Sequence, residues 1–519
     1  MKKLRVGLFL VGLGVLIFLS FFVSPLYEHA TAQSDLQTGW DAVDAYLRSE
    51  MNELHIPGMA VVIVSGDQVV YSQGFGVAAA AGRPVTPQTP MVLGSVSKGI
   101  TALAVMQLVE AGKLDLDAPV VHYLPWFRMA DSPESGLPDA WAQITPRQLL
   151  HQTSGIAEYT GANTWDSRYA GDDALERQVR SFAEFPLVHA PGEAFEYSNA
   201  NYEILGLLVQ AVSGQSYEAY IEKHVFQPLD MRHSYTLAAE ATDLATGYRH
   251  WFGQSFPAPT LPVPREHVPS AMLISTAEDM GHYLIAQMNG GKYGDVQVLS
   301  AQGIAELHHP VAPAWEGATY AMGWAVGADG SLSHNGETPG FTSGIRIEGD
   351  WGVFVVRNIA ANQREQRLDE IAPGILQLVQ GQTPVRNTLN PAFRRTMVEL
   401  TVLFVLQLAG LLWALRRFLR WVRHPESAPH KVTRILAAVL PGLVISLALA
   451  VLLWYMGPIS GHRSFSVQAL GAPDQMLLLG SNIVLALIGA ILQVIKGIWL
   501  WRNRSFPVTS NYTMLKIER

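Results

Sequence analysis

Three long apolar segments near the C-terminus constrain this 519-residue chain more than any other feature of its sequence. They cover residues 397–415, 435–456 and 475–495, and each is about long enough to cross the hydrocarbon core of a membrane as a helix. No Asp, Lys, Arg or His lies in the middle of any of them, whereas transport and proton relays usually need such groups. The sequence therefore predicts a membrane domain over 397–519, with three transmembrane helices that act as an anchor.

The distribution of charge predicts how this anchor crosses the membrane. Between the first two segments, residues 416–434 hold six Lys and Arg and one Glu, which is typical of a cytoplasmic loop. From residue 385 onward the chain has 15 Lys and Arg against 4 Asp and Glu, whereas the preceding residues have 21 against 40. A mildly acidic body with a basic, apolar tail is typical of a membrane protein with an exported domain, and it does not resemble a nucleic-acid-binding surface.

The N-terminus is typical of a chain that is exported. Three basic residues in the first five precede an uncharged run over 6–23, and Ala30-Thr31-Ala32 has the form of a cleavage site. The run is longer than a typical signal core, so residues 1–32 are either a signal peptide or an uncleaved N-terminal anchor. In both cases residues 33–380 form an extracytoplasmic domain, joined by a polar linker over 381–396. The predicted location is the cell membrane, crossed several times.

Residues 33–380 have β patterns at both ends and helical patterns between them. Two hairpins are predicted, at 58–64 with 68–74 and at 342–348 with 351–357. The clearest helical patterns cover 36–54, 200–212, 277–288 and 365–379. Together they predict an α+β fold (an α/β sandwich) in which one antiparallel sheet, built from both ends of the domain, is flanked by helices and carries an inserted all-helical region.

A serine and a lysine three residues apart form the first candidate motif. Ser95 and Lys98 precede an apolar run over 99–111, which predicts a helix buried on most of its surface. Residues i and i+3 share a helix face, so hydroxyl and amine should meet on one side. Burial lowers the pKa of a lysine, which can then act as the base for a serine nucleophile beside the N–H groups of a helix N-terminus. The alternative interpretation is a surface helix with Ser95 as its N-cap.

Two further stretches offer partners for this pair. Tyr197 and Asn199 lie two apart at the start of a helical pattern, where a neighbouring ammonium would favour the phenolate and make Tyr197 a second base. Asn199 is a candidate either to bind substrate or to hold Lys98. His334 and Gly336 lie in a predicted strand end, where a glycine allows close approach of a ligand and a histidine can donate to a carbonyl or carboxylate. The alternatives are an N-cap asparagine with a packed tyrosine, and an ordinary turn.

In this order, the motifs Ser-x-x-Lys, Tyr-x-Asn and His-x-Gly resemble those of the serine beta-lactamase and penicillin-binding-protein superfamily, and specifically of its class C-like branch of serine hydrolases. The resemblance extends over about 36–380, and further stretches carry it: 149–155, 246–249, 275–280 and 322–324. It implies acyl transfer by a serine acyl-enzyme on an amide or ester bond, with water as the final acceptor. No cofactor and no metal are implied, and the histidines 267, 308 and 309 lack metal-site spacing, which indicates a structural or solvated role.

Carried over to this sequence, the resemblance assigns a role to each candidate residue. Ser95 would be the nucleophile, and Lys98 and Tyr197 would share the work of general base. Asn199 would contact substrate. The opposite wall would be His334 and Gly336, with the backbone N–H groups of Ser95 and Glu337 as the oxyanion hole.

The third motif departs from the family's more usual Lys-Thr-Gly, because His334-Asn335-Gly336 stands in its place. A histidine is largely neutral near pH 7, so a substrate carboxylate should bind more weakly. In the class C-like branch, a histidine here is common among esterases and peptide hydrolases. Ser270-Ala271-Met272 also stands where small glycines are more usual, which is expected to change the pocket.

These features predict a membrane-anchored peptidase or esterase that acts on a small-molecule or peptide substrate, peptidoglycan-related compounds included. One alternative is a true beta-lactamase or D-Ala-D-Ala carboxypeptidase. The alternative from another class is a non-catalytic penicillin-binding-like sensor.

Overall fold

The computed structural model describes residues 39–79, 81–131, 139–252, 254–258, 262–315, 317–360, 365–386, 391–429, 431–459 and 473–503. The predicted signal peptide or N-terminal anchor at 1–32 lies outside the described residues.

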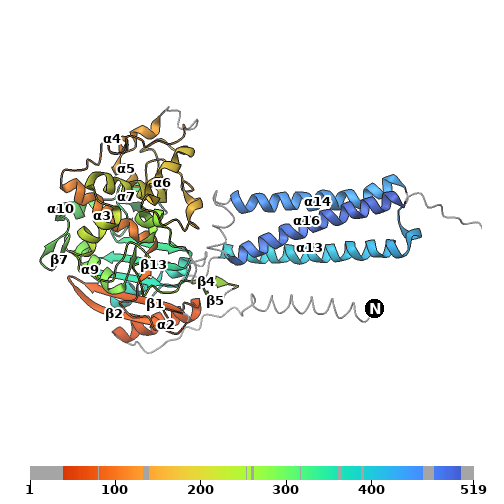
Figure 1. The fold of residues 1–519 in the computed structure, drawn as a ribbon. Helices are drawn as coiled ribbons and strands as arrows, with labels where there is room; N and C mark the ends of the chain where they lie inside the picture. Colours follow the sequence, from red (N-terminus) through yellow and green to blue (C-terminus); the bar gives the residue numbers. More distant parts are fainter. Residues whose placement is uncertain are drawn as a thin grey trace, which may run out of the picture. The chain divides into compact units, whose positions relative to one another are not determined.

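One eight-stranded antiparallel sheet is the framework of the domain, and its strands come from both ends of the predicted domain (Figure 1). Strand β1 (Gly58–Ser65) pairs with β14 (Trp351–Arg357), with Val62 opposite Phe354. The order across the sheet is β2-β1-β14-β13-β12-β11-β10-β9. The other strands are β2 (Gln68–Gly76), β9 (Ala312–Pro313), β10 (Ala318–Tyr320), β11 (Ala325–Gly327), β12 (Leu332–Thr338) and β13 (Phe341–Glu348). The predicted α+β fold and both predicted hairpins are confirmed.

Helices cover both faces of the sheet at its centre. Helix α9 (Ala277–Met288) packs on one face, where a Cβ added to Gly281 would lie 3.0 Å from Val62. Helix α12 (Ile371–Val379) packs on the other face, next to Gly344 of β13. Since successive side chains of a strand point to opposite faces, β1 is apolar on both sides and seven of its eight residues are buried.

The inserted region between β2 and β9 is mainly helical, and its core is formed by α3 (Ser97–Glu110) and α7 (Asn199–Ser213). Eleven of the fourteen residues of α3 are buried, as the apolar run predicted. The shorter helices are α4 (Val120–Tyr123), α5 (Pro146–Leu150), α6 (Ala174–Ser181), α8 (Tyr217–Ile221) and α10 (Ala301–Leu307). Three two-stranded sheets complete the described part of the domain: β3 (Met91–Val92) with β6 (Ile274–Ser275), β4 (Tyr248–Trp251) with β5 (Gln254–Pro257), and β7 (Lys292–Tyr293) with β8 (Val296–Gln297).

Two predicted helices have different bounds in the structure. The helix expected over 36–54 is described as α2 (Trp40–Leu54). The single helix expected over 365–379 is two helices, α11 (Glu365–Asp369) and α12, interrupted at Glu370. The apolar pattern continues through the interruption, so hydrophobic periodicity did not reveal it.

Three of the described helices are long and apolar enough to cross a membrane. They are α13 (Pro391–Arg423), α14 (Val432–Ile459) and α16 (Pro473–Arg502), and each runs beyond the apolar segment expected from the sequence. Large apolar side chains face outward from them, including Leu406, Trp413 and Val451, each more than 60% exposed. Polar side chains face inward: Asn482 donates to Leu400 O and accepts from Gln407, both at 3.1 Å. An apolar exterior with hydrogen bonds between helices suits a lipid environment and indicates membrane association.

Candidate active site

Ser95 lies in a tight turn between β3 and α3, and a glycine makes this turn possible. Gly94 has a φ of +59°, and a Cβ added there would lie 2.3 Å from the backbone N of Glu337. Only a glycine therefore lets the chain pass so close to β12. The N-cap of α3 is Val96, and Ser95 lies in the preceding 3-10 turn, so the alternative of Ser95 as an N-cap is wrong.

Lys98 is the most constrained side chain of the site. It is fully buried, and its Nζ lies 3.0 Å from Ser95 Oγ, 2.6 Å from Asn199 Oδ1 and 2.8 Å from Ser270 O. Burial lowers the pKa of Lys98 to about 7, and the Glu203 carboxylate opposes this shift. A substantial fraction of Lys98 is therefore neutral at neutral pH.

The partners of Lys98 determine where its lone pair points once the amine is neutral. A neutral amine keeps two N–H donors and one lone pair. Asn199 Oδ1 and Ser270 O are acceptors only, so they take both N–H groups. The lone pair is then directed at the Ser95 hydroxyl, the only one of the three contacts that can donate a proton.

Tyr197 lies beside the same pair, but its electrostatics differ from the sequence expectation. Burial raises the pKa of Tyr197 above its usual range, and a hydrogen bond with Ser95 opposes the shift. The Nζ atom of Lys98 lies 4.9 Å from the centroid of the Tyr197 ring. The expected preference for the phenolate is therefore not found, because burial outweighs the neighbouring amine, and Tyr197 stays a protonated phenol at neutral pH.

Asn199 is the first residue of α7, and Ser198 is the N-cap. The interpretation of Asn199 as an N-cap is therefore wrong. Its side chain binds Lys98, which is the second of the two roles considered for it. Ser198 is held in turn by Gln152 Oε1, which accepts from the Ser198 N–H at 3.0 Å. Helix α7 thus presents Asn199 to Lys98 from a fixed start.

His334 lies on β12 and is buried, with both ring nitrogens engaged. Its Nδ1 lies 2.7 Å from Asn335 O and its Nε2 lies 3.1 Å from the Tyr320 hydroxyl. A carbonyl only accepts, so Nδ1 carries the proton and Nε2 accepts from Tyr320. Burial and, to a lesser extent, the charge of Lys98 lower the pKa of His334 to about 3, against the opposing effect of the hydrogen bond to Asn335 O. His334 is therefore neutral at physiological pH.

Gly336 and Glu337 bring β12 against the turn that carries Ser95. A Cβ added to Gly336 would lie 2.0 Å from Leu93 O, and Ser343 on the next strand donates to the same carbonyl at 2.5 Å. The backbone N of Glu337 faces Gly94, as described above, while the residue as a whole is exposed. The structure thus brings together the seven residues singled out from the sequence, from the turn and first residues of α3, the start of α7 with the residue before its N-cap, and β12.

A buried polar cluster behind Lys98 was not foreseen from the sequence. Glu203 lies one turn after Asn199 on α7 and is 1% exposed. It accepts from His267 Nδ1 at 2.6 Å and from Ser270 Oγ at 3.2 Å. Trp165 stacks on the His267 ring at 4.8 Å. His267 is therefore structural, as expected, and the spacing of Asn199 and Glu203 on one helix face was the signal that could have revealed the cluster.

An aromatic cluster surrounds Tyr197 and His334 and was also missed. Trp315 and Tyr320 lie 5.8 and 6.3 Å from the Tyr197 ring, and Phe195 lies 5.4 Å from Trp315. These residues come from three separate segments, so no local pattern in the sequence indicates them.

Among the described residues, His233, Glu278 and Asp279 are the group whose side chains could hold a metal ion. Asp279 already accepts from the His233 N–H and from Ser234 Oγ, both at 2.7 Å, and it follows the N-cap of α9 closely. We read this group as structural.

Residues 43–376 match a protein-family model described as Beta-lactamase. Protein flp of Staphylococcus aureus (strain MW2) is 27% identical over 472 residues, which cover 87% of this chain and 90% of flp. Penicillin-binding protein 4 of Amycolatopsis lactamdurans is 33% identical over 321 residues, which cover 58% of this chain and 80% of that protein.

Two solved structures are similar to the fold. The octameric penicillin-binding protein homologue from Pyrococcus abyssi aligns with a TM-score of 0.56 and 28% identity, covering 67% of this chain and 78% of the other. EstCE1, a hydrolase with promiscuous acyltransferase activity, aligns with a TM-score of 0.56 and 24% identity, covering 64% and 97%. At that identity, the similarity to EstCE1 concerns the fold alone.

Proposed function

The chain belongs to the beta-lactamase family, and we propose that it is a membrane-anchored, extracytoplasmic serine hydrolase that forms an acyl-enzyme at Ser95 with amide or ester substrates. The observation that carries this proposal is the position of Lys98 Nζ, 3.0 Å from Ser95 Oγ and held there by two acceptors. A buried lysine with a lowered pKa, beside a serine hydroxyl, meets the requirement for an activated nucleophile.

In the first half of the reaction, Ser95 Oγ attacks the carbonyl carbon while its proton passes to Lys98 Nζ. The backbone N–H groups of Ser95 and Glu337 stabilise the oxyanion that forms. The tetrahedral intermediate collapses with cleavage of the bond to the leaving amine or alcohol. That group takes a proton, which the Tyr197 hydroxyl relays from Lys98, so the lysine is neutral again.

In the second half, water attacks the ester carbonyl of acylated Ser95. Lys98 takes the proton from water as the new bond forms, and the same oxyanion hole holds the negative charge. Collapse releases the carboxylic acid and returns the proton to Ser95 Oγ. The cycle needs neither a metal nor a redox cofactor, because each step moves only a proton and an acyl group.

A true beta-lactamase or D-Ala-D-Ala carboxypeptidase is the second candidate, and the names of the penicillin-binding relatives favour it. Such substrates carry a carboxylate, which a fixed positive charge on the third wall would hold. His334 is neutral and has both ring nitrogens engaged, so it offers no such charge. We therefore place peptidase or esterase activity first, on peptides or esters of the cell envelope, peptidoglycan-related compounds included.

The hydrolase function is tested by labelling the full-length protein in detergent with a fluorescent phosphonate and with a fluorescent penicillin. We expect phosphonate labelling of the wild type, an intact-mass increase of one adduct, and no labelling of Ser95→Ala. Equal labelling of both proteins would contradict the proposal. A ligand that binds tightly with no adduct would instead support the non-catalytic sensor, and turnover of nitrocefin or release of D-alanine from a pentapeptide would support the second candidate.

The orientation is tested with introduced cysteines, because the chain has none of its own. Asp67 is exposed in the β1–β2 turn, and Ser427 is exposed between α13 and α14. We expect Asp67→Cys to react with a membrane-impermeant maleimide in intact cells, and Ser427→Cys to react only after permeabilisation. The reverse pattern would contradict an extracytoplasmic catalytic domain.

A further inference from the structure

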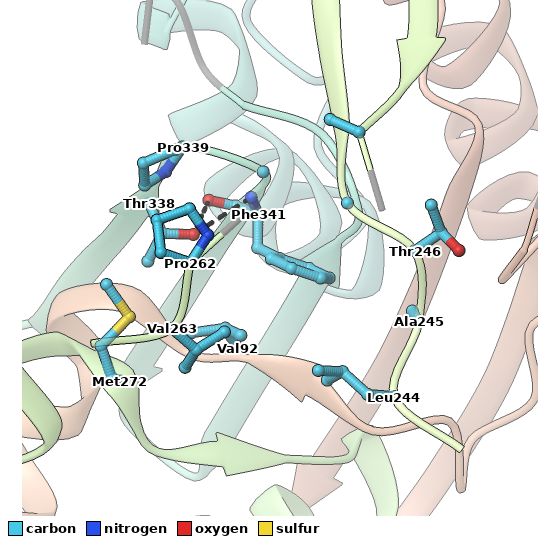
Figure 2. Close-up of a pocket in the computed structure, with 13 residues that line it drawn as sticks. Val92, Leu244, Ala245, Thr246, Pro262, Val263, Met272, Thr338, Pro339 and Phe341 are labelled. Atoms are coloured by element: carbon cyan, nitrogen blue, oxygen red, sulfur yellow. Dashed lines mark hydrogen bonds between the residues drawn. The ribbon is translucent and has the colours of Figure 1, made fainter. Parts of the chain in front are cut away.

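An apolar pocket of about 240 Å³ lies at the end of β12, and none of its thirteen lining residues is charged (Figure 2). Val92, Met272, Thr338 and Phe341 line it, and each is at most 6% exposed. Figure 2 shows the side chains of Val92 and Phe341 in the middle of the lining, with Met272 on one side and Leu244 and Thr246 on the other.

The walls of this pocket continue the elements that build the catalytic centre. Val92 lies on β3, three residues before Ser95. Met272 follows two residues after Ser270, whose carbonyl holds Lys98. Thr338 follows Glu337, whose backbone N faces Gly94. The pocket therefore shares three chain segments with the residues that surround Ser95.

Thr246 and Thr338 are the two residues with polar side chains among the lining residues, and the Thr338 hydroxyl is engaged within its own turn. Thr338 Oγ1 accepts from the Phe341 N–H at 3.2 Å and donates to Phe341 O at 3.4 Å, as the dashed lines in Figure 2 show. Its hydroxyl thus closes the β12–β13 turn. What the pocket offers is mainly the apolar surface of Val92, Val263, Met272 and Phe341.

The size of the pocket suits one substituent and not a whole substrate. Pockets that enclose a complete small ligand usually measure about 300–1,000 Å³. At about 240 Å³ this pocket lies below that range, which suits a short alkyl chain or an aryl group.

We propose that this pocket receives an uncharged, apolar group of the substrate, attached on the acyl or the leaving side of the scissile bond. The proposal rests on the proposed function and specifies the substrate class of the same site. The neutral state of His334 supports the proposal, because the His334 side chain and the pocket lining both favour a substrate with no charge near the scissile bond. Each methylene that the pocket buries is expected to raise kcat/KM about fourfold.

The test uses the full-length protein in detergent with two series of esters. One series lengthens the acyl chain of p-nitrophenyl esters from acetate to octanoate, and the other lengthens the alcohol of acetate esters. We expect kcat/KM to rise with chain length in one series, which identifies the side that enters the pocket, and then to stop rising when the pocket is full.

Two variants and a control tie this dependence to the pocket. Val263 is half-buried in the lining, and Val263→Phe should lower the ratio of long-chain to acetate kcat/KM by at least about tenfold. Met272→Ala should move the optimum to a longer chain, because it enlarges the pocket. The control Val296→Phe, on the exposed strand β8, should leave the ratio as in the wild type.

A wild type whose kcat/KM does not depend on chain length in either series would overturn the pocket proposal, and so would an unchanged ratio in Val263→Phe. These outcomes leave the proposed function intact provided that Ser95 is labelled by the phosphonate. If Ser95 takes no label, the proposed function fails, and the pocket is judged by binding: octanamide should raise the Tm of the wild type and of Val296→Phe, but not of Val263→Phe. Equal shifts in all three would overturn the proposal.

Discussion

The two sides of the site, a helical wall with Lys98 on α3 and a strand wall with His334 on β12, each carry a buried base whose pKa is lowered by burial. The hydrogen bonds of these two bases differ. Lys98 binds two acceptors and keeps its third contact for Ser95 Oγ. His334 uses both of its ring nitrogens on its own domain, at Asn335 and Tyr320. Near pH 7, burial makes His334 neutral and leaves a substantial fraction of Lys98 neutral. Only Lys98 then directs its lone pair at the Ser95 hydroxyl, because the lone pair of His334 accepts from Tyr320. The hydrogen-bond partners, more than burial, therefore distinguish Lys98, the proposed base, from His334.

The largest effect is expected from removing the base on the helical wall. Lys98→Met keeps the length and burial of the side chain but cannot take the Ser95 proton, so the rate of Ser95 acylation should fall about 1,000-fold. The measurement is the second-order rate of phosphonate labelling. Lys113→Met, at an exposed lysine after α3, is the matched control and should label like the wild type. A labelling rate of Lys98→Met within tenfold of the wild-type rate would contradict the role of Lys98 as the base.

A smaller effect is expected from removing the Tyr197 hydroxyl. Tyr197→Phe keeps the ring beneath Lys98 but loses the group that relays a proton to the leaving group, so kcat should fall about 100-fold. Since the phenol is protonated at neutral pH, ester substrates with a good leaving group should lose less than amides. Steady-state kinetics on a matched amide and ester check this, and equal losses on both would contradict the relay.

Making the strand wall more like the helical wall should change which substrates are preferred. His334→Lys introduces a positive charge where a substrate carboxylate would bind, so the ratio of nitrocefin to neutral-ester kcat/KM should rise about tenfold. The new charge also lies near Lys98 and should lower the pKa of that amine, so the ester rate should persist to lower pH than in the wild type. An unchanged ratio would show that the neutral wall does not set the preference.

The smallest expected effect concerns the cluster behind Lys98. The Glu203 carboxylate raises the pKa of Lys98, so Glu203→Gln should lower that pKa, keep the amine neutral to lower pH, and shift the acidic limb of activity downward. The shift should be about one pH unit or less, with little change at the plateau. The pH dependence of kcat/KM is the readout, because a merely structural loss would lower activity at every pH alike. An unmoved or upward-moved limb would contradict the role given to Glu203.

Features that depend on local sequence could be predicted, and features that depend on distant residues could not. Hydrophobic periodicity and turn residues predicted the two hairpins and the helices α7 and α9. The spacing of three residues predicted that Ser95 and Lys98 would meet. A single sheet built from both ends of the domain was predicted from the β patterns there, whereas the pairing of β1 with β14 is seen only in the structure.

The protonation of the site was harder to predict, because burial cannot be seen in a motif. The neighbouring amine predicted a phenolate at Tyr197, whereas burial keeps it protonated. The carbonyl of Ser270, which holds Lys98, carries no side-chain signal at all, and Glu203 meets His267 only through the fold. The apolar pocket likewise joins five separate segments of the chain.

The claim that Lys98 is the base for Ser95 is tested most directly by the pH dependence of Ser95 acylation. The rate of phosphonate labelling would be measured between about pH 5 and pH 9 for the wild type and for Glu203→Gln. The rate should fall as pH drops through about 7, because Lys98 takes up a proton, and the midpoint should lie at lower pH in the variant. A rate that does not change across this range in the wild type would contradict it.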